Sequence, residues 1–175
     1  MNQAMKDGIQ ESIAGFSLPE YYQIPNVGLY LEQTAKYISE YVNCLGDFSL
    51  TGSMISNYVK KGLIVSPVKK QYNREQIAYL IFIAVAKSVL SMEDLRLFVA
   101  LQKKTYPARQ AYDYFREEME NVLRYVFGEK DTLENLGVDN SDEKTMLRNT
   151  VITVAHKVYL DKYFAALRKE EAGTE

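Results

Sequence analysis

The sequence has very few of the residues that cross-link a chain or hold a structural metal. Among its 175 residues it contains one cysteine, Cys44, and one histidine, His156. One cysteine cannot form a disulfide within the chain, and this pair cannot make a His/Cys zinc site. We therefore expect no metal and no cofactor. The 47% hydrophobic content is enough for an apolar core to stabilise the fold.

Long hydrophobic runs are also absent. The most apolar stretch, residues 77–86, would span about 15 Å as a helix, half of what a bilayer core requires. The N-terminal segment carries Lys6, Asp7 and Glu11 and lacks an apolar stretch behind a basic start, unlike a secretory signal. We expect a cytoplasmic protein without membrane contact, in which residues 77–86 form a buried helix.

Motifs that carry catalysis are missing as well. The sequence shows no phosphate-binding glycine loop, no paired catalytic carboxylate motif and no nucleophile elbow. We therefore expect that the protein is not an enzyme and has no catalytic residues.

Acidic residues are absent from one segment, although the whole chain is close to neutral. Residues 48–74 contain no Asp or Glu, and Lys60, Lys61, Lys69, Lys70 and Arg74 give them five positive charges. Since the formal net charge is −2, the rest of the chain carries −7. A concentrated positive patch on a neutral protein is typical of local phosphate binding.

Within this segment, Thr51 is a good N-cap, and Gly62 is a good stop for a short helix that reaches Lys61. If Ile55 and Tyr58 face inward, four polar side chains share the outer face at helical spacing. We call these the polar ridge: Ser53, Ser56, Asn57 and Lys60. Serine, asparagine and lysine are residue types that contact base edges and phosphates.

An amphipathic helix over residues 26–45 precedes this one, as expected for a helix-turn-helix. Residues 63–72 are β-prone around Pro67, so we predict a short hairpin there. That hairpin would form a wing over the neighbouring phosphates. Its candidate DNA-binding residues are Lys69, Lys70, Gln71 and Tyr72, followed by Arg74.

The remaining pattern is helical. Asn73 with Gln76, and Ser91 with Asp94, resemble capping boxes that open helices reaching about residues 90 and 104. Apolar residues at three- and four-residue spacing predict two more helices, one from Pro107 to Gly128 and one after Ser141. Between these two helices, residues 129–140 form an acidic loop. We expect the two helices to pack as an antiparallel hairpin.

The run from Met54 to Ile64, followed by Pro67, Lys70 and Tyr72, resembles the N-terminal winged helix of MerR-type regulators. More closely, residues 24–99 are similar to an uncharacterised bacterial family, domain of unknown function 1836, itself MerR-like. The resemblance implies DNA binding. With it, the expected fold is mainly α, a MerR-like winged helix-turn-helix with a short β-hairpin wing and a C-terminal helical hairpin.

Three regions are expected: an N-terminal tail over residues 1–25, the winged helix-turn-helix domain over 26–105, and the C-terminal helical hairpin over 106–175. The hypothesis is a sequence-specific transcriptional regulator that binds double-stranded DNA as a homodimer through its C-terminal helices. It leaves room for a small-molecule effector.

One alternative stays open: a helical protein-interaction or ligand-sensing domain that keeps the winged-helix shape without binding DNA. MerR proteins typically have an arginine and an aromatic residue where this chain has Ser56 and Asn57. In that case partners would bind the apolar stripes around Met119 and Val154.

Overall fold

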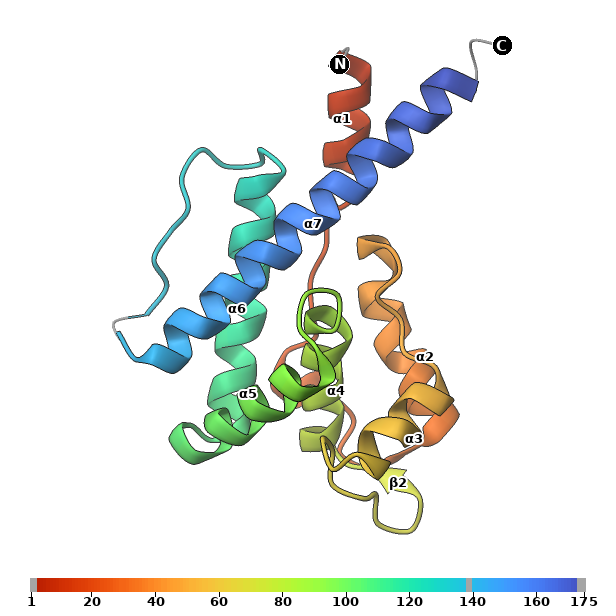
Figure 1. Cartoon of the computed structure of the whole chain (residues 1–175), viewed down its shortest axis with the longest axis vertical. Coiled ribbons are helices and arrows are strands. Elements are labelled where there is room, and N and C mark those ends of the chain that lie inside the picture. Colours follow the sequence, from red (N-terminus) through yellow and green to blue (C-terminus); the bar gives the residue numbers. More distant parts are fainter. Residues whose placement is uncertain (1–2, 138–139, 173–175) are drawn as a thin grey trace.

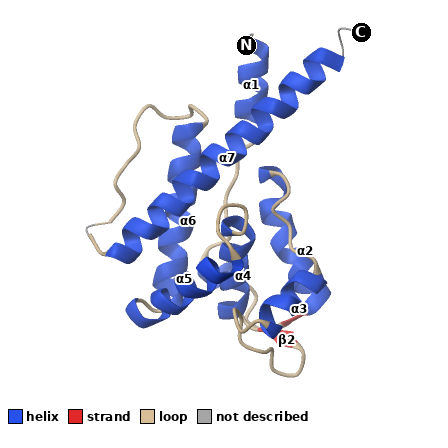
Figure 2. Ribbon diagram, viewed as in Figure 1, coloured by secondary structure: helices blue, strands red, loops and turns tan. Residues whose placement is uncertain are grey.

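The computed structural model describes residues 3–137 and 140–172, which are mainly helical, as the sequence predicts. Residues 1–2, 138–139 and 173–175 belong to the predicted tail, acidic loop and C-terminal region, and lie outside the described residues. Figure 2 shows helices as nearly all of the regular structure. The helices are α1 (Gln3–Glu11), α2 (Leu31–Val42), α3 (Gly52–Lys60), α4 (Arg74–Ala86), α5 (Met92–Thr105), α6 (Ala108–Val126) and α7 (Asp142–Ala172). Two single-turn helices, η1 (Tyr21–Gln23) and η2 (Asn43–Leu45), and two short strands, β1 (Leu29–Tyr30) and β2 (Gln71–Tyr72), complete the described elements.

The helix starts predicted at Thr51, Asn73 and Ser141 are confirmed by hydrogen bonds at their caps. The Thr51 hydroxyl accepts from the backbone N–H of Met54 at 3.2 Å, and the Ser141 hydroxyl accepts from that of Lys144 at 3.2 Å. Asn73 and Gln76 form the reciprocal capping box, with distances of 2.9 and 2.8 Å. These bonds satisfy backbone donors that the first helical turn leaves open.

The centre of the molecule is α4, and ten of its thirteen residues are buried. It therefore has no polar face, which agrees with the prediction of a buried helix at residues 77–86. Helices α2, α6 and α7 all contact it, as Figure 1 shows. Within the described residues, no helix combines the length and the apolar character that crossing a membrane requires.

The segment predicted as an N-terminal tail contains a helix that packs on the rest of the protein. Residues 3–11 form α1, which lies beside the C-terminal half of α7, with Met5 and Ile9 facing Ala165 and Ala166. Figure 1 shows the two helices at the same end of the molecule. A nine-residue helix is marginal alone, and packing against α7 supplies the stability that its local sequence lacks.

The predicted hairpin within residues 63–72 is wrong in its strand pairing. Strand β2 pairs antiparallel with β1, which precedes α2, and Leu29 lies opposite Tyr72. Inside the segment only a single bridge, between Val68 and Gln71, closes a tight turn. Leu63 is buried in the core, so the segment's first residues are not free to form an outer strand. The same pairing makes α2 begin at Leu31 rather than near Asn26.

The predicted antiparallel packing of the last two helices is also wrong. Contacts between α6 and α7 advance in the same direction along both: Tyr114 with Lys144, Glu118 with Arg148, and Phe127 with Tyr159. The two helices therefore run in parallel, crossing as Figure 1 shows. The long connection between residues 126 and 142 permits this arrangement. At up to about 3.3 Å per residue, it can return along a helix of nineteen residues.

The apolar stripes of these helices are used internally. Met119 and Val154 are both fully buried in the core, so neither offers a surface to a partner. Exposed apolar side chains on α7 lie farther along, at Leu160 and Phe164, each 50% exposed. Any partner of α7 meets these residues and not the stripe around Val154.

Candidate functional site

The polar ridge on α3 is exposed along its whole length. Ser53, Ser56, Asn57 and Lys60 all face solvent, while Ile55 and Tyr58 anchor the helix from the other side. The Ser53 hydroxyl lies 2.9 Å from that of Thr51, so Ser53 also takes part in the helix cap. The remaining ridge side chains point away from the core and are free to meet a ligand.

A tight turn over residues 68–71, the lysine turn, carries the next two predicted residues. The Gln71 N–H donates to the Val68 carbonyl at 2.9 Å, and Lys69 and Lys70 occupy the two central positions with φ of 50° and 65°. Positive φ at both central residues is the geometry of a type I′ turn, which usually takes Asn or Gly. Both lysines are exposed at its tip.

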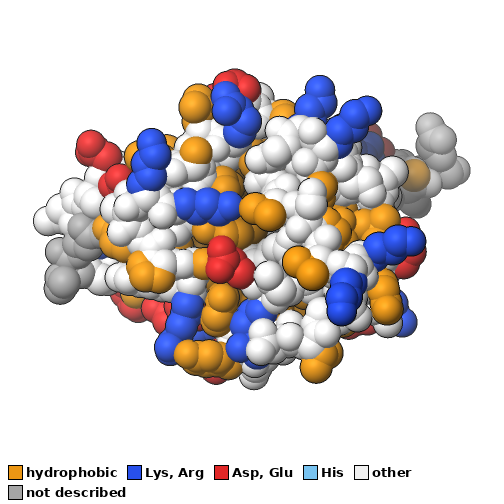
Figure 3. Space-filling view, turned by 90° about the horizontal axis from the view of Figure 1, so that it is seen from below, with side chains coloured by type: hydrophobic (Ala, Val, Ile, Leu, Met, Phe, Trp, Pro, Cys, Tyr) orange, Lys and Arg blue, Asp and Glu red, His pale blue; other side chains and the backbone are white. Residues whose placement is uncertain are grey.

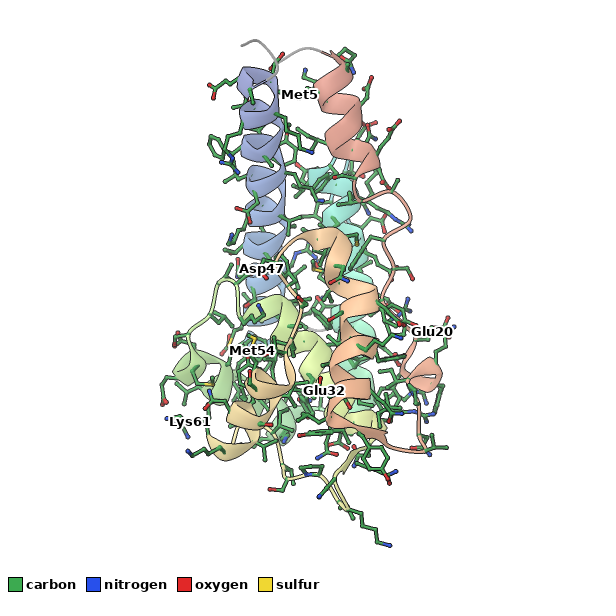
Figure 4. All side chains as sticks on the ribbon, turned by 90° about the vertical axis from the view of Figure 1, so that its right-hand side faces the viewer. Met5, Glu20, Glu32, Asp47, Met54 and Lys61 are labelled. Atoms are coloured by element: carbon green, nitrogen blue, oxygen red, sulfur yellow. The ribbon has the colours of Figure 1, made fainter. Side chains whose placement is uncertain are left out.

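The polar ridge and the lysine turn lie toward the same end of the molecule, remote from the two termini (Figure 1). Seen from that end, Figure 3 shows Lys and Arg side chains spread over the face and fewer acidic ones, one of them near its centre. Figure 4 places Lys61 at the end of α3, near this same end. Seven of the ten predicted residues are therefore exposed: Ser53, Ser56, Asn57, Lys60, Lys61, Lys69 and Lys70.

The other three predicted residues have structural contacts. Tyr72 is 4% exposed, and burial raises the pKa of its hydroxyl. Gln71 is half-buried in the strand pair, with its Cβ close to Gly28. Arg74 donates from Nε to the Ile24 carbonyl at 2.8 Å and from Nη2 to the Tyr22 carbonyl at 3.2 Å. Because its side chain is almost fully buried, Tyr72 is the least able of the three to reach a ligand.

One acidic side chain approaches the ridge from outside the acid-free segment. The Glu32 carboxylate on α2 lies against Gly52 at the start of α3, where a Cβ would clash with its oxygen. Figure 4 shows Glu32 facing the helix that carries Met54. A carboxylate is favourable at the positive end of a helix dipole. The positive charge of the site is therefore concentrated toward the C-terminal end of α3 and the lysine turn.

Exposed apolar side chains also lie at this end, and sequence reasoning did not assign them to the site. Val27, Val65 and Val68 are 85%, 67% and 74% exposed, and Tyr30 is exposed as well. The β-prone pattern placed Val65 and Val68 in a hairpin, but it gave no signal that β1 would bring Tyr30 alongside them. Figure 3 shows apolar side chains among the charged ones.

A second unpredicted feature is a stack of two guanidinium groups on Tyr22. The Arg74 and Arg109 guanidinium carbons lie 5.4 and 4.4 Å from its ring centre. Arg109 also donates to the Tyr22 hydroxyl at 2.7 Å. Such cation–π contacts stabilise the packing of η1. Since the three residues come from separate segments, local sequence patterns could not reveal the stack.

Among residues 3–137 and 140–172, no three His, Cys, Asp or Glu side chains come together to hold a metal ion.

Comparisons with curated proteins and with solved structures gave no match. A comparison with protein families did. The model of the family described as Domain of unknown function (DUF1836) matches residues 19–115, from just before η1 to the middle of α6. This match covers more than half of the chain, including the polar ridge and the lysine turn, and the chain therefore belongs to this family.

Proposed function

We propose that the protein is a sequence-specific DNA-binding transcriptional regulator. Helices α2 and α3 form the helix-turn-helix, and the lysine turn with β2 and β1 forms a small wing. The observation that carries the proposal is the exposure of the polar ridge and the lysine turn at one end of the molecule, within a segment that has no acidic residue.

The ridge supplies the chemistry that base reading requires. In this docking, α3 enters the major groove and the Asn57 amide pairs with adenine, which it can contact with both its donor and its acceptor. The Ser56 hydroxyl donates or accepts at a neighbouring base edge. Lys60, one turn farther along, binds guanine or a phosphate.

The lysine turn supplies phosphate contacts. The backbone that carries these two lysines is fixed by the Val68–Gln71 hydrogen bond, so binding does not have to order the turn itself. Lys61 adds a third charge beside α3. Contacts of this type position the protein on DNA, and they make the affinity depend on salt.

A single module of this size binds DNA weakly, so we infer a homodimer that spans half-sites about 34 Å apart. The dimer surface that the exposed residues favour is the strip on α7 with Leu160 and Phe164. Light scattering of the full chain tests this inference. Leu160→Asp with Phe164→Asp should give a monomer with an unchanged helical circular dichroism spectrum, and a variant that stays dimeric would move the interface elsewhere.

Selection of bound fragments from a random DNA pool tests the function itself. The wild type should enrich a two-fold symmetric sequence. Lys60→Glu with Lys70→Glu should abolish gel retardation of the enriched fragment. Failure to enrich any sequence would refute the proposal, and so would retardation that the double charge reversal leaves unchanged.

A second candidate is a protein-interaction domain on the same scaffold. The observation that favours it is the exposure of Val27, Val65 and Val68 beside the lysines, since clustered apolar side chains at a surface are typical of protein contacts. Ser56 in place of the arginine typical of MerR proteins points the same way. This candidate requires that no DNA sequence be enriched and that binding to DNA be negligible at physiological salt.

A further inference from the structure

A cavity of about 290 Å³ lies between α5, α6 and the start of α7, away from the polar ridge. Its walls are mostly apolar and include Phe98 from α5, Ala111 from α6 and Leu147 from α7. The volume is about twice that of an apolar cavity known to hold benzene, and it is close to the lower end of small-molecule pockets. It therefore suits a ligand somewhat larger than one aromatic ring.

An inner space of about 40 Å³ shares Phe98, Ala111 and Leu147 with this cavity. Its other lining residues include the rings of Phe82 and Phe115. The inner part of the site is thus mainly apolar and aromatic, apart from the Gln102 amide, which is hydrogen-bonded to the Tyr79 hydroxyl and the Tyr106 carbonyl. Such a lining favours a ring or a branched hydrocarbon. Polar groups of a ligand must stay toward the outer cavity.

The outer cavity holds one nearly buried cation. Lys144 is 9% exposed, and its ammonium donates to the Gly137 carbonyl at 3.1 Å and lies 5.7 Å from the centre of the Tyr114 ring. Both partners are neutral. Across the described residues, no carboxylate lies within ion-pair distance of this ammonium, and the nearby Glu118 carboxylate pairs with Arg148 at 2.8 Å.

A nearly buried ammonium with neutral partners still has the capacity to bind an anion, and a charge-assisted hydrogen bond is stronger than a neutral one. Glu143 also lines the cavity, but the Thr105 hydroxyl donates to its carboxylate at 2.9 Å, on the α5 side. Among the described residues that line the cavity, Lys144 is the one cation and Glu143 the one anion, and the remaining walls are mostly apolar.

We propose that this cavity binds a small carboxylic acid with an apolar, ring-sized body. The carboxylate accepts a hydrogen bond from Lys144, and the body packs against Phe98, Ala111 and Leu147. Because the cavity is separate from α3 and the lysine turn, this site does not depend on DNA binding.

The test compares two probes of the same shape, 4-phenylbutyrate and its neutral amide, by isothermal calorimetry on the full chain. The wild type should bind the carboxylate at least about tenfold more tightly than the amide. Lys144→Met should bind both equally, because it keeps the apolar stem and removes the charge. Lys157→Met, the same change outside the cavity on the same helix, should keep the wild-type preference.

A second variant tests the location without touching the charge. Ala111→Leu adds volume to the cavity wall and should weaken both probes about tenfold or more without lowering the thermal unfolding temperature. No saturable binding of 4-phenylbutyrate at about 1 mM would overturn the proposal. Equal affinity of wild type for the two probes, or full binding by Ala111→Leu, would overturn it as well.

Discussion

The geometry of the lysine turn allows its two charges to be removed without disturbing the backbone. Lys69 and Lys70 both have positive φ, which costs roughly 1–2 kcal/mol for a residue with a Cβ. Asn-Gly is the preferred pair for a turn of this geometry. Lys69→Asn with Lys70→Gly should therefore raise the free energy of unfolding by about 1 kcal/mol, or the midpoint by about 2–4 °C.

The same double variant should lose DNA affinity. If Lys60, Lys61, Lys69 and Lys70 each contact one phosphate, a dimer neutralises eight, and log affinity against log salt has a slope of about −7. Removing two lysines from each protomer leaves a slope of about −4. A gain in stability together with a loss of affinity would separate the function of the turn from its role in folding.

Fluorescence anisotropy of a labelled fragment, titrated between about 50 and 200 mM salt, measures this slope. The matched control is Lys104→Gln with Lys169→Gln, which removes the same charge from exposed positions on α5 and α7 and should keep the wild-type slope. An unchanged slope for the turn variant would refute the assignment of the lysine turn to phosphate. A fall in its unfolding temperature would refute the reasoning from φ.

Three further changes test neighbouring parts of the structure. Ser56→Arg should tighten DNA binding at least about tenfold and make the slope more negative by about 0.9 per protomer, because it adds a cation to the ridge; unchanged anisotropy titrations would mean that the ridge does not face the duplex. Arg74→Ala should lower the urea-measured stability by about 1–3 kcal/mol, through lost bonds to backbone carbonyls including that of Tyr22, while leaving the salt slope unchanged. Burial raises the pKa of Glu118, so the folded protein holds this proton more tightly than the unfolded chain, and the resulting stability is lost as the pH rises from about 4.3 through the folded pKa. The stability of wild type relative to Glu118→Gln should therefore fall as the pH is raised above about 4 in urea titrations, and parallel pH curves would contradict it.

Sequence reasoning succeeded where the cause of a structure is local. The N-cap serine, threonine and asparagine residues act within one helical turn, so Thr51, Asn73 and Ser91 marked the starts of α3, α4 and α5 correctly. The exposed face of α3 followed from helical spacing for the same reason. Candidate site residues on α3 were therefore the most predictable part of the site.

Sequence reasoning failed where a structural feature depends on contacts between segments that are far apart in the sequence. Nothing near Leu29 indicates that it pairs with Tyr72, and this pairing decides that Tyr72 is buried. The direction of α7 relative to α6 depends on the path of a long connection and not on apolar spacing, which is the same for parallel and antiparallel helices. The cavity beside Lys144 needs three helices in place before it exists.

The placement of α7 also has a consequence for synthesis on the ribosome. Helix α7 contacts α1, α4, α5 and α6, so it closes a core that the earlier helices have left open. Until residues beyond 142 emerge from the exit tunnel, the face of α6 that carries Met119 and the apolar face of α1 remain exposed to solvent. A nascent chain that stalls before that point exposes a large apolar surface. Chaperones that bind exposed hydrophobic segments should therefore retain it.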